Sequence, residues 1–159
     1  MIAIDLGSNT LRVLEYNCTT GTQISEYEKT VKTADGLAHH GTINNEAIGR
    51  VISAIQEAQE QIDFSSSVVR AVTTEAVRRA VNSDDVLSQI KNATGVAFDI
   101  ISGQEEARLT LLAAKHRLNT LQYPSDTFVL IDIGGGSTEL IFHYENETVS
   151  KSFPVGIVT

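Results

Sequence analysis

Two turns in this sequence place glycine, hydroxyl side chains and an aspartate within a few positions of one another. Asp5 precedes the turn "LGSNT", and Asp132 precedes the turn "IGGGST". Glycine allows backbone N–H groups to approach an oxyanion closely, and serine and threonine hydroxyls add donors. Aspartate oxygens suit Mg²⁺, which commonly bridges to phosphates. Two such turns facing each other would hold a phosphate chain from both sides, although either turn taken alone is better explained as a hairpin that needs a positive φ.

The two turns belong to an internal repeat. The segments "AIDLGSNTLRVLEY", from residue 3, and "LIDIGGGSTELIFHY", from residue 130, both run from apolar residues through Asp and Gly to Ser and Thr, and then into an alternating strand that ends in Tyr. A repeat at this distance indicates that the second copy begins a second structural unit. Because each copy carries its own aspartate, phosphate binding becomes the better interpretation of the pair.

The segment "ISGQEEARLTLL" adds a candidate catalytic carboxylate. Ser102 and Glu105 fit a capping box, in which Glu105 would reach back to the amide of the cap residue. That role leaves Glu106 unexplained. Near the glycine turns, Glu106 could orient or deprotonate a water that attacks phosphorus. The alternative is a solvated carboxylate that the helix dipole favours in a first turn.

Other chemically capable side chains give weaker signals. Arg78 and Arg79 in "VTTEAVRRAVN" offer planar, bidentate donors for phosphate oxygens, but an arginine on a short helix is more often solvated or in a surface ion pair. His39 and His40 lie in a glycine-bounded segment without a nearby metal-ligand partner, so we treat them as loop residues. Cys18 is the single cysteine and cannot form an internal disulfide.

The elements that must position these residues follow from hydrophobic periodicity and from turn residues. Three strands come first, and the pattern then changes to an amphipathic helix in which Ile48, Val51, Ile52 and Ile55 recur at helical spacing. The expected order is strands at 1–6, 11–17 and 22–33, a loop at 34–45, a helix at 45–62, a strand at 65–74, helices at 74–82 and 83–95, a strand at 96–101, a helix at 102–121 and a strand at 127–133. This order predicts an α/β layer with a mixed sheet, antiparallel at first and parallel later.

After residue 124 the pattern restarts. We therefore expect a complete first unit at 1–124 and the three opening strands of a second, incomplete unit at 125–159, with no helices to cover those strands. An uncovered sheet is marginal alone and exposes an edge. This favours a partial chain of a protein about twice as long; otherwise, the final strands must pack on the first unit or on another subunit.

Composition limits the classes of protein. With 42% hydrophobic and 20% charged residues, the chain has the composition of a soluble globular protein. A net charge of -8 argues against a nucleic-acid-binding surface, because such affinity comes largely from clustered Lys and Arg. The lone cysteine favours a reducing cytoplasm. No apolar run approaches the length of a membrane span, and no signal peptide is apparent at the N-terminus.

Together these motifs resemble the exopolyphosphatase and guanosine pentaphosphatase (Ppx/GppA) family. The matching stretches are "IDLGSNTLR" at 4–12, "VTTEAVRRAVN" at 72–82, "ISGQEEARL" at 101–109, "IDIGGGSTEL" at 131–140 and "SFPVG" at 152–156. The resemblance implies a ribonuclease H-like (actin-like ATPase) lobe with a mixed five-stranded sheet and flanking helices, followed by the opening strands of a similar lobe. One departure concerns Glu75 and Arg79, where the family more often has a small residue and a glutamate.

The resemblance also implies residue roles. Glu106 would be the general base or water-orienting carboxylate. Asp132 and Glu139 would serve both the Mg²⁺ and the reacting phosphate, with Asp5 as a further metal-side carboxylate. The residues that would bind phosphate oxygens are Ser8, Asn9, Thr10, Arg78, Gly135, Gly136, Ser137 and Thr138.

The implied activity is Mg²⁺-dependent hydrolysis of a terminal phosphoanhydride, in inorganic polyphosphate or in guanosine pentaphosphate. The resemblance implies a homodimer for the full-length protein, and we expect little or no activity from these 159 residues alone. A nucleotide-binding switch or scaffold of the actin or Hsp70 kind, without fast hydrolysis, is the main alternative. A sugar kinase is a third possibility, from which "GSNT" and "SGQEEARL" point away.

Overall fold

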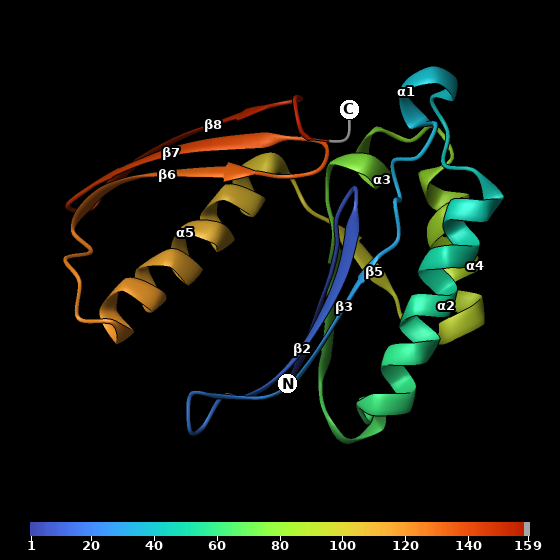
Figure 1. Cartoon of the computed structure of the whole chain (residues 1–159), viewed down its shortest axis with the longest axis horizontal. Helices are drawn as coiled ribbons and strands as arrows, with labels where there is room; N and C mark the ends of the chain where they lie inside the picture. Colours follow the sequence, from blue (N-terminus) through green and yellow to red (C-terminus); the bar gives the residue numbers. More distant parts are fainter. Residues whose placement is uncertain (158–159) are drawn as a thin grey trace.

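Eight strands form two separate sheets within residues 1–157, which the computed structural model describes (Figure 1). The first sheet contains β1 (Ile2–Leu6), β2 (Thr10–Asn17), β3 (Thr22–Thr30), β4 (Val69–Thr73) and β5 (Phe98–Ile100), in the order β3-β2-β1-β4-β5. The β1–β2 and β2–β3 pairs are antiparallel, and the β1–β4 and β4–β5 pairs are parallel. The predicted mixed five-stranded sheet is therefore confirmed.

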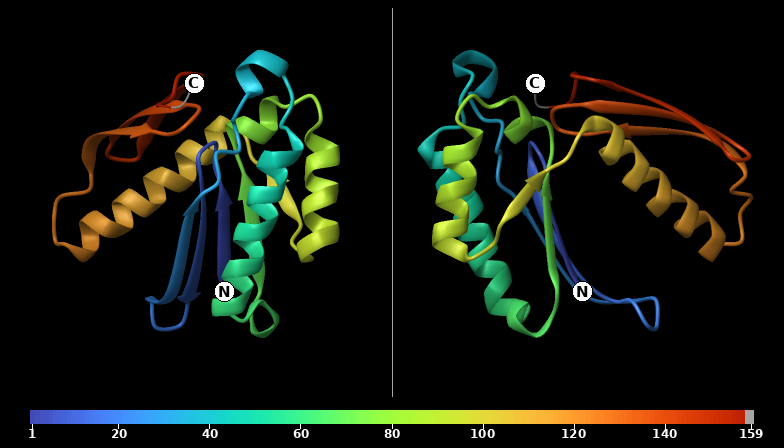
Figure 2. Two further views of the ribbon diagram at one scale, coloured as in Figure 1. Left: turned by 45° about the vertical axis from the view of Figure 1, so that its right-hand side comes forward. Right: turned by 180° about the vertical axis from the view of Figure 1, so that it is seen from behind.

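The main core lies between this sheet and two helices. Helices α2 (Asn45–Gln61) and α4 (Ser83–Thr94) lie side by side on one face of the sheet (Figure 2). The alternation along β1 and the helical spacing along α2 turn their apolar side chains toward each other, and both sets are almost fully buried. Members of this core include Ile2, Ile4, Leu6, Ile48, Val51 and Ile55.

Polar side chains and glycines set the ends of these helices. Asn44 caps α2 by accepting a hydrogen bond from the backbone N–H of Ala47 at 2.7 Å. Gly95 ends α4 in the left-handed region, with φ of 76°. Asn82 precedes α4 but does not cap it, because its side chain instead bonds both the N–H and the carbonyl of Ile43.

Short elements differ from the sequence expectation. The segment expected to be a loop at 34–45 contains the short helix α1 (Leu37–His40), which is bounded by Gly36 and Gly41, both with positive φ. A single 3₁₀ turn, η1 (Phe64–Ser66), precedes β4. Helix α3 (Glu75–Arg79) follows β4 directly and carries the two neighbouring arginines.

The second sheet is antiparallel and contains β6 (Thr127–Ile133), β7 (Thr138–Tyr144) and β8 (Glu147–Phe153) in that order. Helix α5 (Gly103–Thr120) lies along one face of this sheet, beneath it in Figure 1. A small second core joins α5 to the sheet and consists of Ala107, Leu111, Ile141, Phe128 and Leu130. The expectation that no helix covers these strands was therefore wrong.

The opposite face of the second sheet is apolar and exposed within the described part of the chain. Strand alternation turns one set of side chains toward α5 and the other set away from it. The large apolar side chains on the outer face include Val129, Ile131, Ile133, Phe142, Tyr144 and Val149, each at least half exposed. The domain limits at 1–124 and 125–159 stay a prediction.

Candidate functional site

The two repeated turns meet at one pocket of about 630 Å³ between the two sheets. Side chains and turns from β1, α5 and β6 form its walls. The lining residues are Ala3, Asp5, Gly7, Ser8, Asn9, Thr10, Arg12, Val72, Thr74, Ile101, Glu106, Leu109, Thr110, Ala113, Asp132, Ile133, Gly134, Gly135, Gly136, Ser137 and Ile157. Nine predicted site residues are therefore brought to one pocket, namely Asp5, Ser8, Asn9, Thr10, Glu106, Asp132, Gly135, Gly136 and Ser137.

Glycine is required in these turns because the two turns approach each other closely. Neither turn contains a glycine with positive φ. A Cβ on Gly135 would lie 3.1 Å from the Cβ of Asn9, and a Cβ on Gly136 would lie 2.5 Å from Oγ of Ser8. The alternative of a simple hairpin with positive φ was therefore wrong, because glycine here allows one turn to pack against the other.

The two turns have equivalent internal hydrogen bonds. In the first, the N–H of Gly7 donates to the carbonyl of Thr10 at 2.9 Å; in the second, the N–H of Gly134 donates to the carbonyl of Ser137 at 2.8 Å. Each aspartate lies two residues before the donor glycine of its own turn. The repeat seen in the sequence is therefore also a repeat of backbone geometry, and it places Asp5 and Asp132 at equivalent positions.

Three carboxylates line the pocket from three elements: Asp5 on β1, Asp132 on β6 and Glu106 in the first turn of α5. The pKa of Glu106 is raised to about 7, mainly by burial and then by the charge of Glu139, while Arg78 opposes the rise. Withdrawal from water also raises the pKa of Asp5, against the lowering effect of Arg12. Such perturbed carboxyls are typical of catalytic sites.

One carboxylate oxygen of Glu106 is buried and accepts no hydrogen bond from the described residues. Within residues 1–157, no donor lies within hydrogen-bonding distance of its buried Oε2 atom. The nearest cation is Arg78, whose Nη2 lies 3.6 Å from this oxygen. A buried carboxylate oxygen that accepts no hydrogen bond is unfavourable, so Oε2 keeps an unused capacity to accept one.

The start of α5 differs in one detail from the predicted capping box. Ser102 caps the helix, and its Oγ accepts a hydrogen bond from the N–H of Glu105 at 3.2 Å. The side chain of Glu105 does not reach back to the cap; it accepts two hydrogen bonds from Arg108, each 2.7 Å long. The predicted role of Glu105 was therefore wrong, because a bidentate arginine one turn further along binds its carboxylate.

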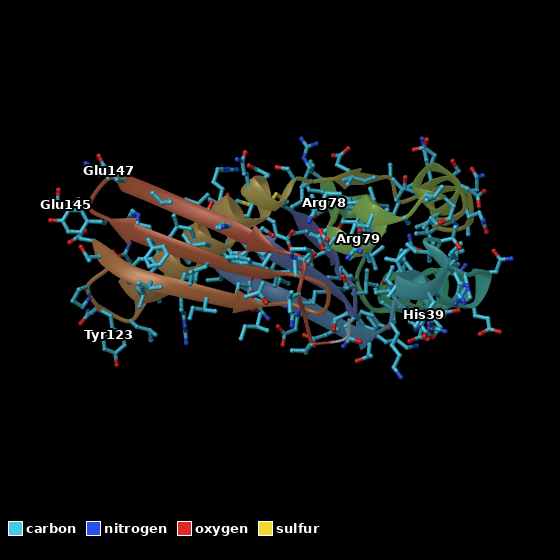
Figure 3. All side chains as sticks on the ribbon, turned by 90° about the horizontal axis from the view of Figure 1, so that it is seen from above. His39, Arg78, Arg79, Tyr123, Glu145 and Glu147 are labelled. Atoms are coloured by element: carbon cyan, nitrogen blue, oxygen red, sulfur yellow. The ribbon has the colours of Figure 1, made fainter. Side chains whose placement is uncertain are left out.

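Three predicted site residues do not line the pocket. The Oγ1 of Thr138 donates to the carbonyl of Val155 at 2.6 Å. Glu139 is 1% exposed and accepts a hydrogen bond from Ser152 at 2.8 Å. Arg78 donates to a backbone carbonyl and to Glu75 instead of pointing a free guanidinium into the pocket. Figure 3 shows Arg78 and Arg79 on α3, beside the point where the two sheets meet.

The pocket also contains polar residues that the sequence analysis did not select. Thr110 donates a 3.3 Å hydrogen bond to Oδ2 of Asp132. Thr110 lies four residues after Glu106, and this helical spacing is the signal that could have identified it. Arg12 lies opposite Asp5 in the β1–β2 register and also pairs with the exposed Glu28 at 3.0 Å.

The oxygen ligands in the pocket can be compared with those that the predicted Mg²⁺ would need. Within residues 1–157, no group of three or more His, Cys, Asp or Glu side chains is arranged to hold a metal ion. Mg²⁺ is usually bound by one or two carboxylates together with water and substrate phosphates. Asp5 and Asp132 provide two oxygen ligands in the same pocket, so they fit a Mg²⁺ that arrives with a phosphate chain. His39 and His40 lie on α1, outside the pocket lining.

Comparisons with known proteins agree with this geometry. The model of the Ppx/GppA phosphatase family matches residues 16–159. A curated relative, exopolyphosphatase 1 of Mycobacterium leprae, is 34% identical over 158 residues, which are 96% of this chain and 46% of that protein. The chain therefore spans about half the length of the curated relatives it matches.

Solved structures show the same fold. An exopolyphosphatase from Cytophaga hutchinsonii aligns with a TM-score of 0.84 at 26% identity, over 98% of this chain and 50% of that one. The Ppx/GppA family member of Aquifex aeolicus aligns with a TM-score of 0.78 at 28% identity, over 99% of this chain and 51% of that one. These matches confirm the predicted ribonuclease H-like (actin-like ATPase) fold class.

Proposed function

Because the chain belongs to the Ppx/GppA phosphatase family, we propose that the whole protein hydrolyses a terminal phosphoanhydride. The substrate would be inorganic polyphosphate or guanosine pentaphosphate, and the product would be orthophosphate. The observation that carries this proposal is the position of Glu106, a carboxylate with a pKa of about 7 in the same pocket as two phosphate-type turns and two aspartates.

In this proposal Glu106 is the general base. Its Oε2, which accepts no hydrogen bond within residues 1–157, would accept a proton from a water as the water oxygen attacks the terminal phosphorus, and the phosphoanhydride oxygen would leave with the shortened chain. A base with a pKa near the working pH is well matched to proton transfer. Phosphoryl transfer otherwise depends mainly on positioning and charge stabilisation.

The two turns would bind the phosphate chain. Ser8, Asn9 and Thr10 from one turn, and Gly135 to Ser137 from the other, would donate backbone and hydroxyl hydrogen bonds to phosphate oxygens. Because the turns come from different sheets, the bound chain would also hold the sheets together. Local donors of this kind would allow a chain with a net charge of -8 to bind a polyanion.

Asp5 and Asp132 would hold Mg²⁺, and Thr110 would keep the Asp132 carboxylate oriented. When bound, the ion would neutralise phosphate charge in a pocket with an excess of carboxylates. Glu139 would act from behind the pocket wall, through its charge on Glu106. The cytoplasmic location and the homodimer remain part of the proposal and rest on the single cysteine and on family resemblance.

The test is phosphate release by the protein that the whole reading frame around these residues encodes. With Mg²⁺ present, we expect orthophosphate from at least one of the two substrates, and a loss of at least about a hundredfold in kcat for Glu106→Gln. Release from neither substrate would refute the hydrolase. ATP binding without phosphate release would instead indicate a nucleotide-binding switch.

A further inference from the structure

The carboxylate of Glu75 stands beside the second phosphate-type turn and has no part in the function proposed above. Its side chain is only 12% exposed. A Cβ built on Gly136 would lie 3.4 Å from Cγ of Glu75, so this glutamate packs directly against the turn. Thr74, the preceding residue, lines the pocket. An acidic residue is therefore held beside the turn at which an anion is expected to bind.

Glu75 already forms ion pairs with two arginines. Its Oε2 accepts a 2.6 Å hydrogen bond from Nη2 of Arg78, and its Oε1 lies 3.7 Å from Nη1 of Arg79. The other terminal nitrogen of Arg78 donates to the backbone carbonyl of Ile101. A carboxylate between arginines and beside a glycine turn has the surroundings that a phosphate group would have.

A second pair in the chain shows that this contact differs from an ordinary helix ion pair. Glu105 and Arg108 have the same three-residue spacing and a similar separation of 2.7 Å, but their side chains are 40% and 57% exposed. The corresponding values for Glu75 and Arg78 are 12% and 25%. Exposed pairs contribute little, whereas a mostly buried charge is strongly affected by the loss of its partner.

We propose that Glu75 competes with the substrate's phosphate for Arg78 and thereby sets the affinity of the pocket for phosphate chains. In the ligand-free protein Glu75 binds Arg78 and keeps it out of the pocket. A phosphate must displace Glu75 in order to bind this arginine. This inference rests on the proposed function, because it requires a phosphate in the pocket. Glu75 is thus an affinity-determining residue and takes no part in the chemical step.

The same exchange involves the general base. Arg78 lies 3.6 Å from Glu106, and its charge opposes the rise in the pKa of that carboxyl. When Arg78 moves from Glu75 to a phosphate oxygen, its distance from Glu106 changes as well. Binding of the phosphate chain would therefore change the electrostatic environment of Glu106.

The test is calorimetric binding of tripolyphosphate to the protein of the whole reading frame, without Mg²⁺ so that the ligand is not hydrolysed. Glu75→Gln keeps the shape of the side chain and removes its charge, and Glu75→Ser removes the carboxylate altogether. We expect both variants to bind tripolyphosphate about tenfold to a hundredfold more tightly than the unmodified chain. The matched control is Glu46→Gln, in the exposed first turn of α2, which should leave the affinity unchanged.

The outcomes separate this inference from the proposed function. Equal affinity in the unmodified chain and both Glu75 variants, or weaker binding in the variants, would overturn the inference and leave the phosphate site standing. Failure of the unmodified chain and of all the variants to bind would count against the proposed function and against the inference with it.

A measurement on the unmodified chain covers the case in which the variants do not fold. The side-chain ¹⁵N resonances of Arg78 should shift when tripolyphosphate saturates the pocket, because the guanidinium exchanges its carboxylate partner for phosphate. Unchanged Arg78 resonances at saturation would overturn the inference.

Discussion

Replacing Glu106 by glutamine should change how the stability of this chain depends on pH. The pKa of Glu106 rises from an ordinary 4.5 to about 7 in the folded chain, mainly because the carboxyl is withdrawn from water. Between these two values the folded state binds more protons than the unfolded state. Raising the pH therefore lowers the free energy of unfolding, and the stability present below pH 4.5 is lost as the pH rises through 7.

The magnitude follows from the size of the shift. A change of one unit in pKa corresponds to about 1.4 kcal/mol, so this carboxyl costs the folded state up to about 3 kcal/mol at pH 8 relative to pH 4.5. Its side chain is 19% exposed, so screening by solvent is limited. Glutamine cannot ionise and avoids this cost. Relative to the unmodified chain, Glu106→Gln should gain up to about 3 kcal/mol in stability between pH 4.5 and pH 8.

The assay is urea denaturation of both chains at several pH values from 4.5 to 8, with the free energies of unfolding compared at each pH. Glu105→Gln is the matched control, because Glu105 is the adjacent residue and hydrogen bonds from Arg108 lower the pKa of its carboxyl. That variant should show no gain as the pH rises. A constant difference between Glu106→Gln and the unmodified chain across this range would refute the account of the buried carboxyl.

Three further predictions concern the turns, a helix and the pocket wall. Gly136→Ala should destabilise the chain and abolish tripolyphosphate binding, because its Cβ would lie 2.5 Å from Oγ of Ser8; unchanged binding in calorimetry would contradict the close packing of the turns. Gly49→Ala, in the interior of α2 with no atom within 4 Å of the new methyl group, should raise the free energy of unfolding by about 0.5–1 kcal/mol; a lower urea midpoint would contradict this. Thr110→Val should remove the 3.3 Å hydrogen bond to Asp132 and weaken Mg²⁺-dependent tripolyphosphate binding severalfold, with little change in binding without Mg²⁺; an equal loss in both conditions would refute a role in metal positioning.

Much of the fold and part of the site could be predicted because local patterns determine them. Alternation and helical spacing identify the strands and α2, and the two aspartate-glycine turns recur with the same backbone hydrogen bond. Gly135 and Gly136 were selected from the sequence and line the pocket, but the reason for glycine is the contact between the turns. That reason depends on how two distant segments meet, which a single sequence does not encode locally.

The side on which α5 packs could not be inferred from the sequence. Its buried apolar residues in the second core are only Ala107 and Leu111, a stripe too narrow to indicate which sheet it covers. The burial of Glu139 could not be predicted from the sequence either. Glu139 lies opposite Asp132 in the β6–β7 register, but it belongs to the central strand, where Ser152 of the neighbouring β8 covers it.

The ion pair between Glu75 and Arg78 could have been predicted from the sequence. A glutamate three residues before an arginine on a helix predicts an ion pair. Glu75 is unusual for the family at this position, but a contact with Arg78 was not predicted. The depth at which the pair lies could only come from the structure.

The most direct test of the central claim is orthophosphate release from polyphosphate and guanosine pentaphosphate by the protein of the whole reading frame, measured across pH 5 to 9 with and without Mg²⁺. The proposal predicts release that requires Mg²⁺ and rises about tenfold between pH 6 and pH 8, as the Glu106 carboxyl with a pKa of about 7 loses its proton. It also predicts that Glu106→Gln abolishes turnover while phosphate binding remains. Mg²⁺-dependent release that persists in Glu106→Gln with an unchanged pH profile would contradict the assignment of Glu106 as the base.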